Sequence, residues 1–278
     1  MDTSGIQTFL ILILFVLGLL SLFLISHPRG NRRSNALLGG LLFSWSLMFW
    51  DSLGIVSGWT LSYTRFAFWG NQFFWVIGPL IYFYTRSVLD PDFRLKKKDI
   101  WHLLPFFLML IPSQIAWQST PKEIRLEAVE NAYIMQDAWL GVIILLMHVQ
   151  FGIYLWLSFK ELKSYRNRLA NNFSQEDQVQ LPWLRNFLRG ILLIIFLGLV
   201  QNMFRFLSDS KEGYEFTLLW SGIALLSFFG WLVLMAMRKP EIFSGLEALK
   251  LDTHEKSLDQ EEEKELQQVT NRLQSFMN

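Results

Sequence analysis

The sequence contains no cysteine among its 278 residues, so disulfide bridges, thiolate metal sites and cysteine nucleophiles are excluded. Charge is also scarce, because only 18% of the residues are Asp, Glu, Lys or Arg. The phosphate-binding glycine loop, the zinc-ligand spacing and the nucleophile elbow of common soluble enzymes are all missing. The 4 histidines are scattered along the chain, with no two of them within one helical turn. We therefore expect no metal site and no cofactor.

Apolar residues dominate what is present, at 52% of the chain, with 25 Phe and 12 Trp. The charges occur in short clusters between long apolar stretches, a pattern typical of a polytopic membrane protein, whose side chains face hydrocarbon. Seven stretches supply, or come close to, the roughly 20 residues that a spanning helix needs. They lie near 6–26, 36–57, 66–86, 102–117, 138–158, 187–207 and 217–237. We therefore predict an all-α fold, a seven-transmembrane-helix bundle that occupies residues 1–240.

The fourth and the first of these stretches have features that bear on their assignment as spanning helices. The fourth is short, and Pro105 and Pro112 favour a kink or a break in it, although proline is tolerated in membrane helices. The first has no basic residue before it and no small-residue cleavage site after it. This favours a spanning helix over a signal peptide.

The distribution of Lys and Arg predicts the orientation. The 1–2, 3–4 and 5–6 loops, counted to their helix ends, carry most of them: Arg29, Arg32, Arg33, Arg86, Arg94, Lys96, Lys97, Lys98, Lys160, Lys163, Arg166, Arg168, Arg185 and Arg189. The 2–3, 4–5 and 6–7 loops carry only Arg65, Lys122, Arg125, Arg205 and Lys211. The positive-inside rule places the first set in the cytoplasm, with the amino terminus outside and the carboxyl terminus inside. We expect the basic clusters to contact anionic lipid headgroups rather than nucleic acid.

Residues 241–278 differ in composition and predict a cytoplasmic linker or tail helix. The segment is polar, and Ser257 or Asp259 is a plausible N-cap. One apolar stripe runs along it, formed by Leu266, Val269, Leu273 and Phe276. We expect this stripe to dock on another surface, and pairing of two copies in a homodimer is one such arrangement.

Polar side chains inside the predicted spans are the best candidates for a site, because they are costly in lipid. At a similar depth in the outer half of the bilayer the predicted topology places Asp51 in the second span, Asn71, Gln72 and Trp75 in the third, and Gln201, Asn202 and Arg205 in the sixth. One interpretation is an outward-open pocket for an unknown small-molecule ligand. The other is a set of interhelical hydrogen bonds, with an Asp51–Arg205 pair, that only holds the bundle together.

Several segments, in this order and spacing, are similar to one family: "GPLIYFYTRSVLDPDF" (78–93), "IWHLLPFFLMLI" (100–111), "NNFSQEDQVQLPWLRNFL" (171–188) and "RKPEIF" (238–243). The chain resembles the membrane-embedded amino-terminal half of AraC-type helix-turn-helix transcriptional regulators of Bacteroidetes-like bacteria. The resemblance implies a sensor in the bacterial inner membrane that passes a signal to a cytoplasmic transcription-regulator domain. It also likens the tail to the linker helix of that group. The pair of helix-turn-helix units is not part of this sequence, so no direct nucleic-acid binding is expected of this chain.

Two other functions remain open from the residues alone. A small-solute transporter or channel could use the outer polar groups, but the inner halves of the spans offer few polar residues and no internal repeat is visible. An integral-membrane enzyme acting on lipid would need a cluster of acid and base, and Asp90, Asp92 and His102 near the inner face form the only such group. Because Asp-Pro-Asp also forms a simple turn, we expect no catalytic residues and no enzyme.

Overall fold

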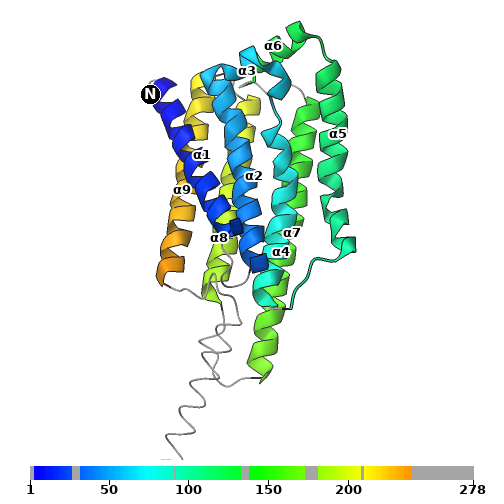
Figure 1. Cartoon of the computed structure of the whole chain (residues 1–278), viewed down its shortest axis with the longest axis vertical. Helices are drawn as coiled ribbons and strands as arrows, with labels where there is room; N and C mark the ends of the chain where they lie inside the picture. The colour runs from blue at the N-terminus through cyan, green and yellow to red at the C-terminus, as the bar shows by residue number, and fades with distance from the viewer. Residues whose placement is uncertain are drawn as a thin grey trace, which may run out of the picture.

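The computed structural model describes residues 3–26, 32–90, 92–132, 138–172, 181–207 and 210–238 (Figure 1). Its α-helices are α1 (Thr3–Ser26), α2 (Arg32–Ser57), α3 (Trp59–Ser62), α4 (Phe74–Leu89), α5 (Leu104–Ser119), α6 (Lys122–Glu130), α7 (Ala138–Asn172), α8 (Pro182–Leu207) and α9 (Lys211–Arg238). Short 3₁₀ helices are η1 (Thr64–Phe66), η2 (Gly70–Phe73) and η3 (Lys97–Leu103). Within the described ranges no strand occurs, which confirms the all-α prediction. The predicted tail helix at 241–278 lies outside them.

Six helical segments are long and apolar enough to cross a membrane: α1, α2, η3 with α5, α7, α8 and α9. Many of their large apolar side chains face outward, as on α1, where Ile11, Phe15 and Leu22 are 55%, 62% and 65% exposed. A soluble monomer rarely exposes apolar surface on this scale, whereas hydrocarbon solvates it. The structure is therefore that of a helical, multi-pass membrane bundle.

The third predicted span differs most from the structure. Its α-helix does not begin near residue 66 but at Phe74, and it runs for 16 residues to Leu89. The preceding residues form η1 and η2, and Phe68 between them has a φ of 65°, which interrupts a right-handed helix. Asn71 and Gln72 thus lie in a 3₁₀ turn and not in the helix.

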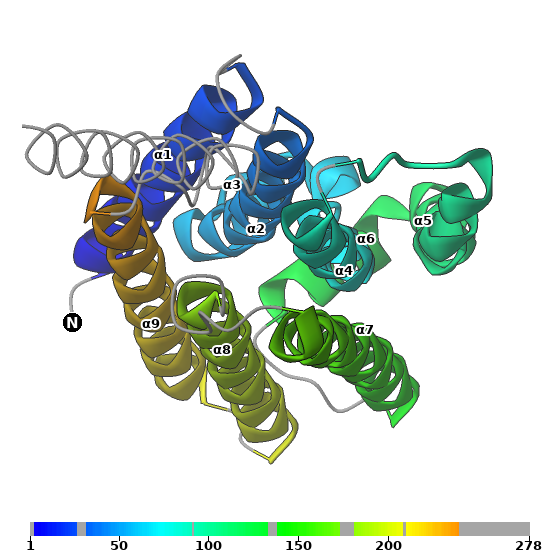
Figure 2. The same cartoon turned by 90° about the horizontal axis from the view of Figure 1, so that it is seen from below.

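Six helices pack in a closed ring in the order α1, α2, α4, α7, α8 and α9, with α9 returning to α1 (Figure 2). Aromatic side chains fill its interior. The ring centroids of Tyr84 and Phe187 are 5.3 Å apart, as are those of Trp45 and Phe229. Each of these four side chains is buried. The centre of the bundle is therefore a packed core.

Helix α5 lies outside this ring, beyond α4 (Figure 2), and none of its residues is buried. It continues through Pro112 to Ser119, so the proline-rich fourth stretch does form a helix. Pro105 occupies the first turn, where its missing N–H removes no helical hydrogen bond. With 35 residues, α7 is about 52 Å long and extends past the bundle at the end away from α3 and α6 (Figure 1).

Candidate ligand-binding site

Residues 58–73, here called the strap, leave the end of α2 and fold back against it. The Oδ2 atom of Asp51 accepts a hydrogen bond of 2.9 Å from the backbone N–H of Asn71, and Asp51 is only 2% exposed. Gly70 approaches so closely that an added Cβ would lie 1.8 Å from the Leu47 carbonyl oxygen. Asp51, a predicted site residue, therefore anchors the strap to α2.

Gln72 and Trp75, the other two predicted residues of the third stretch, make hydrogen bonds through their backbone groups. Gln72 donates its backbone N–H to the Trp69 carbonyl at 3.3 Å, and its side chain is half-buried. Trp75 is buried, and its carbonyl accepts a hydrogen bond of 3.1 Å from Nε2 of Gln150 on α7. Trp75 thus helps to join α4 to α7.

The three predicted residues of α8 have three different partners. Gln201 Oε1 accepts a hydrogen bond of 3.0 Å from Ser221 on α9. Asn202 donates to the Gly198 carbonyl of its own helix at 2.9 Å. Arg205 donates to the Ala132 carbonyl, and its guanidinium lies 5.0 Å from the centre of the Tyr214 ring. These contacts attach α8 to α9 and to the segment after α6.

The predicted residues therefore do not converge on one another in the part of the chain that the structure describes. No hydrogen bond or ion pair there joins the Asp51–Asn71 contact to the α8 residues, and the Asp51–Arg205 pair is not formed. Two buried polar atoms among them, Asp51 Oδ1 and Arg205 Nε, have no hydrogen-bond partner among the described residues. The hydrogen bonds observed for these residues lie within one helix or between elements of the bundle.

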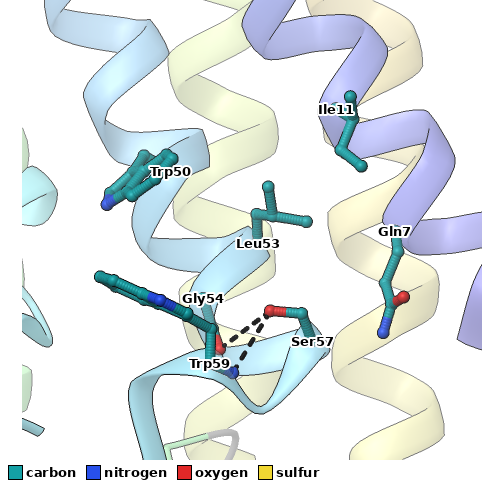
Figure 3. A pocket seen from close by; sticks show the side chains of 7 residues that line it. All are labelled: Gln7, Ile11, Trp50, Leu53, Gly54, Ser57 and Trp59. Carbon is teal, nitrogen blue, oxygen red and sulfur yellow. Dashed lines mark hydrogen bonds between the residues drawn. The ribbon is translucent and has the colours of Figure 1, made fainter. Parts of the chain in front are cut away.

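A pocket of about 260 Å³ lies elsewhere, between α1, α2 and α3 (Figure 3). Its lining residues are Gln7, Ile11, Trp50, Leu53, Gly54, Ser57 and Trp59. The Trp50 and Trp59 rings meet edge to face with centroids 5.4 Å apart. Among the described residues no charged side chain lines the pocket, and its polar lining consists of the neutral side chains of Gln7 and Ser57.

The strap forms one wall of this pocket. Thr60 donates its hydroxyl to the Gly54 carbonyl at 2.9 Å, and an added Cβ at Gly54 would lie 2.7 Å from Thr60 Cγ2. Because Gly54 has no side chain, α3 lies directly on α2 and Trp59 is held beside Trp50. The hydrogen bond from Asn71 to Asp51 fixes the other end of the strap.

This pocket is only weakly indicated by the amino-acid sequence. Gln7 is a single amide in an otherwise apolar stretch, and such residues often serve only helix packing. Its position opposite Trp50 and Ser57 depends on the pairing of α1 with α2, which a single sequence does not specify.

A buried arginine, also not identified from the sequence as a structural residue, supports the strap from α6. Arg125 is 5% exposed and donates from Nε to Thr64 Oγ1 at 3.2 Å. Its Nη1 donates to the Thr120 carbonyl at 2.7 Å, near the end of α5. Trp117 Nε1 donates to the Thr64 carbonyl at 2.9 Å. These bonds connect α5, α6 and η1.

The three residues of the candidate catalytic group make separate hydrogen-bond contacts. Asp90 Oδ1 accepts the backbone N–H of Asp92 at 3.0 Å, which is a turn contact. His102 Nδ1 lies 2.8 Å from the Tyr154 hydroxyl on α7. Among the described residues, no group of three or more His, Asp or Glu side chains is placed to hold a metal ion.

The fold and the pocket define a class, a helical multi-pass membrane protein with a small, uncharged pocket at one end. Comparison with known proteins adds no relative, because no family model, no curated protein and no solved structure matches the chain.

Proposed function

We propose that this chain is an integral-membrane sensor that relays a ligand or membrane signal through α9 to a cytoplasmic output, and that it is not an enzyme. The proposed topology has seven spans, with α4 as the third, in the bacterial inner membrane. The amino terminus lies outside and the carboxyl terminus inside. The output is a transcription-regulator domain, following the resemblance of residues 78–93 and 100–111 to the sensor half of AraC-type regulators.

The grouping of basic residues supports this topology. Arg33, at the start of α2, donates a hydrogen bond of 2.9 Å to the Phe93 carbonyl. This brings the 1–2 and 3–4 connections to one end of the bundle, next to four exposed basic residues, Arg94, Lys96, Lys97 and Lys98. The strap and α6 lie at the opposite end (Figure 1). Under the positive-inside rule the strap and the pocket face outward.

The observation that carries the sensor proposal is that two of the three helices lining the pocket, α1 and α2, also touch α9. On α1, the side chains of Phe9 and Ile13 would lie 2.7 Å from a Cβ added at Gly222. On α2, Trp45 packs edge to face on Phe229. Because α9 leads into residues 239–278, a change in the spacing of α1 and α2 would reach the carboxyl-terminal segment through α9.

The packed interior favours sensing over transport. Tyr84, Phe187 and Phe229 are each no more than 2% exposed inside the ring. A solute path would have to open through these aromatic contacts. A sensor needs only two arrangements of the helices with different affinity for the ligand.

The test is to fill the pocket with a larger side chain and to measure the position of α9. Pulsed electron paramagnetic resonance spectroscopy measures the distance between spin labels on α7 and α9 in lipid nanodiscs. We expect pocket filling to shift it, and an unchanged distance would overturn the proposal.

A further inference from the structure

We propose that the pocket between α1, α2 and α3 binds one neutral, single-chain amphiphile, such as a monoacylglycerol, drawn from the bilayer leaflet on the strap side. This inference names the ligand class of the proposed sensor, and its signalling role rests on that function. The binding itself follows from how the lining residues are arranged.

Polarity changes along the depth of the pocket. Gln7 and Ser57, its two polar side chains, lie near the ends of α1 and α2 beside the strap (Figure 3). Ile11 lies one turn deeper on α1, and Leu53 one turn deeper on α2, with Trp50 beyond it. An amphiphile whose head remains at the interface and whose chain points toward the bilayer centre matches this order.

The two polar groups at the mouth are only weakly bound within the protein. Gln7 Nε2 donates to the Val56 carbonyl at 3.4 Å. The Ser57 hydroxyl donates to the Gly54 carbonyl and accepts the Trp59 N–H, both also at 3.4 Å. Bonds this long are near the geometric limit, so both side chains can exchange them for the hydroxyls of a ligand.

The size, charge and accessibility of the pocket further restrict the class of ligand that it can bind. A volume of about 260 Å³ is below the roughly 300–1,000 Å³ of pockets for drug-sized ligands, so it suits one slender chain rather than a two-chain lipid. In the part of the chain that the structure describes, no charged side chain lines the pocket to pair with an anionic or cationic head. Ile11 and Trp50 are 55% and 46% exposed on the lipid-facing surface, which lets a chain enter sideways from the bilayer.

The experiment uses the full chain in phosphatidylcholine nanodiscs and a monoacylglycerol with a photoactivatable diazirine in its acyl chain. Mass spectrometry then locates the adducts. We expect saturable labelling at Ile11, Trp50 and Leu53. Excess unlabelled monoacylglycerol should compete, whereas the anionic lysophosphatidic acid of the same chain length should compete at least about tenfold less well.

A pair of variants on α1 provides the matched control. Ile11→Trp fills the pocket and should lower the labelling about tenfold. Leu12→Trp places the same ring on a neighbouring position that is 51% exposed and does not line the pocket, so it should label like the unmodified chain. Gln7→Leu removes one head contact and should weaken competition about two- to tenfold. Equal melting temperatures in the same nanodiscs show that the variants are folded.

Labelling that Ile11→Trp leaves unchanged, labelling spread evenly over the lipid-facing helices, or equal competition by the anionic lipid would each overturn the amphiphile proposal. These failures are distinct from failure of the sensor proposal. If labelling fails while Ile11→Trp still moves α9, the ligand class is wrong and the sensor stands. If labelling succeeds while α9 keeps its position, the site stands and the sensor proposal fails.

Discussion

The carboxylate of Asp51 on α2 accepts a hydrogen bond of 2.9 Å from the backbone N–H of Asn71, twenty residues further along the chain. This bond closes the strap at one end, and the bond from Thr60 to the Gly54 carbonyl holds the other. The position of Trp59 in the pocket wall depends on both.

Removal of the Asp51 carboxylate should therefore loosen the strap. Asp51→Ala leaves the Asn71 N–H without its partner, and we expect a loss of about 1–3 kcal/mol of stability. Asp51→Asn keeps an acceptor oxygen and should lose less. Thermal unfolding in nanodiscs checks this. Ser52→Ala is the control, because Ser52 donates a hydrogen bond of 3.4 Å to the Met48 carbonyl of its own helix and does not contact the strap through a hydrogen bond in the described part of the chain. Equal stability of Asp51→Ala and Ser52→Ala would contradict the anchoring role.

A methyl group at Gly70 should displace the strap from α2. The added Cβ would lie 1.8 Å from the Leu47 carbonyl oxygen, which is backbone and cannot rotate away. We expect Gly70→Ala to destabilise the protein by about 3 kcal/mol or more. Gly18→Ala is the control, because nothing lies within 4 Å of its Cβ. A Gly70→Ala variant as stable as Gly18→Ala would show that the strap does not pack as described.

Loss of Arg125 should free the strap from α5 and α6. Arg125→Leu removes the donors to Thr64 and to the Thr120 carbonyl, and hydrogen bonds from a charged group contribute about 1.5–3 kcal/mol each. Arg125→Lys should rescue only in part, because an ammonium group lacks the planar fork that reaches both acceptors. We expect faster hydrogen exchange over residues 58–73. Lys122→Leu changes an exposed cation of the same helix and should leave that exchange unaltered.

The orientation can be tested with single cysteines, because the chain has none of its own. Exposed Lys97 and exposed Glu123 lie in the connections before and after α5. In intact cells stripped of their outer membrane, a membrane-impermeant maleimide should label Glu123→Cys and not Lys97→Cys. In inverted vesicles the result should reverse. Labelling of both from the same side would refute the proposed topology.

The sequence predicted the helical class well, because long apolar stretches between charged clusters leave few other structures. The carboxyl-terminal ends of α8 and α9 lie within one residue of the predicted ends, at 207 and 237, whereas both helices start earlier than predicted. The predicted start of the third span was wrong, because residues 64–73 form η1 and η2 and not an α-helix. In this segment Gly70 lies against the Leu47 carbonyl, a contact between residues far apart in sequence that a single sequence does not reveal.

The predicted site residues show the same limit, that contacts between distant parts of the chain cannot be read from one sequence. Composition and depth singled out Asp51 and Arg205 as polar groups within apolar helices. Their partners, the Asn71 N–H and the Ala132 carbonyl, are backbone groups that no side-chain pattern reveals. The pocket likewise exists only once α1 and α2 are paired.

The most direct test of the central claim is the distance between Ile153→Cys on α7 and Leu234→Cys on α9, both carrying spin labels. These positions are 53% and 60% exposed, so labels there disturb little packing. We predict that Ile11→Trp, added to this pair, shifts the distance distribution by about 1–2 Å, the scale of helix shifts in signalling proteins, while Leu12→Trp leaves it in place. Identical distributions for Ile11→Trp and Leu12→Trp would contradict the coupling of the pocket to α9.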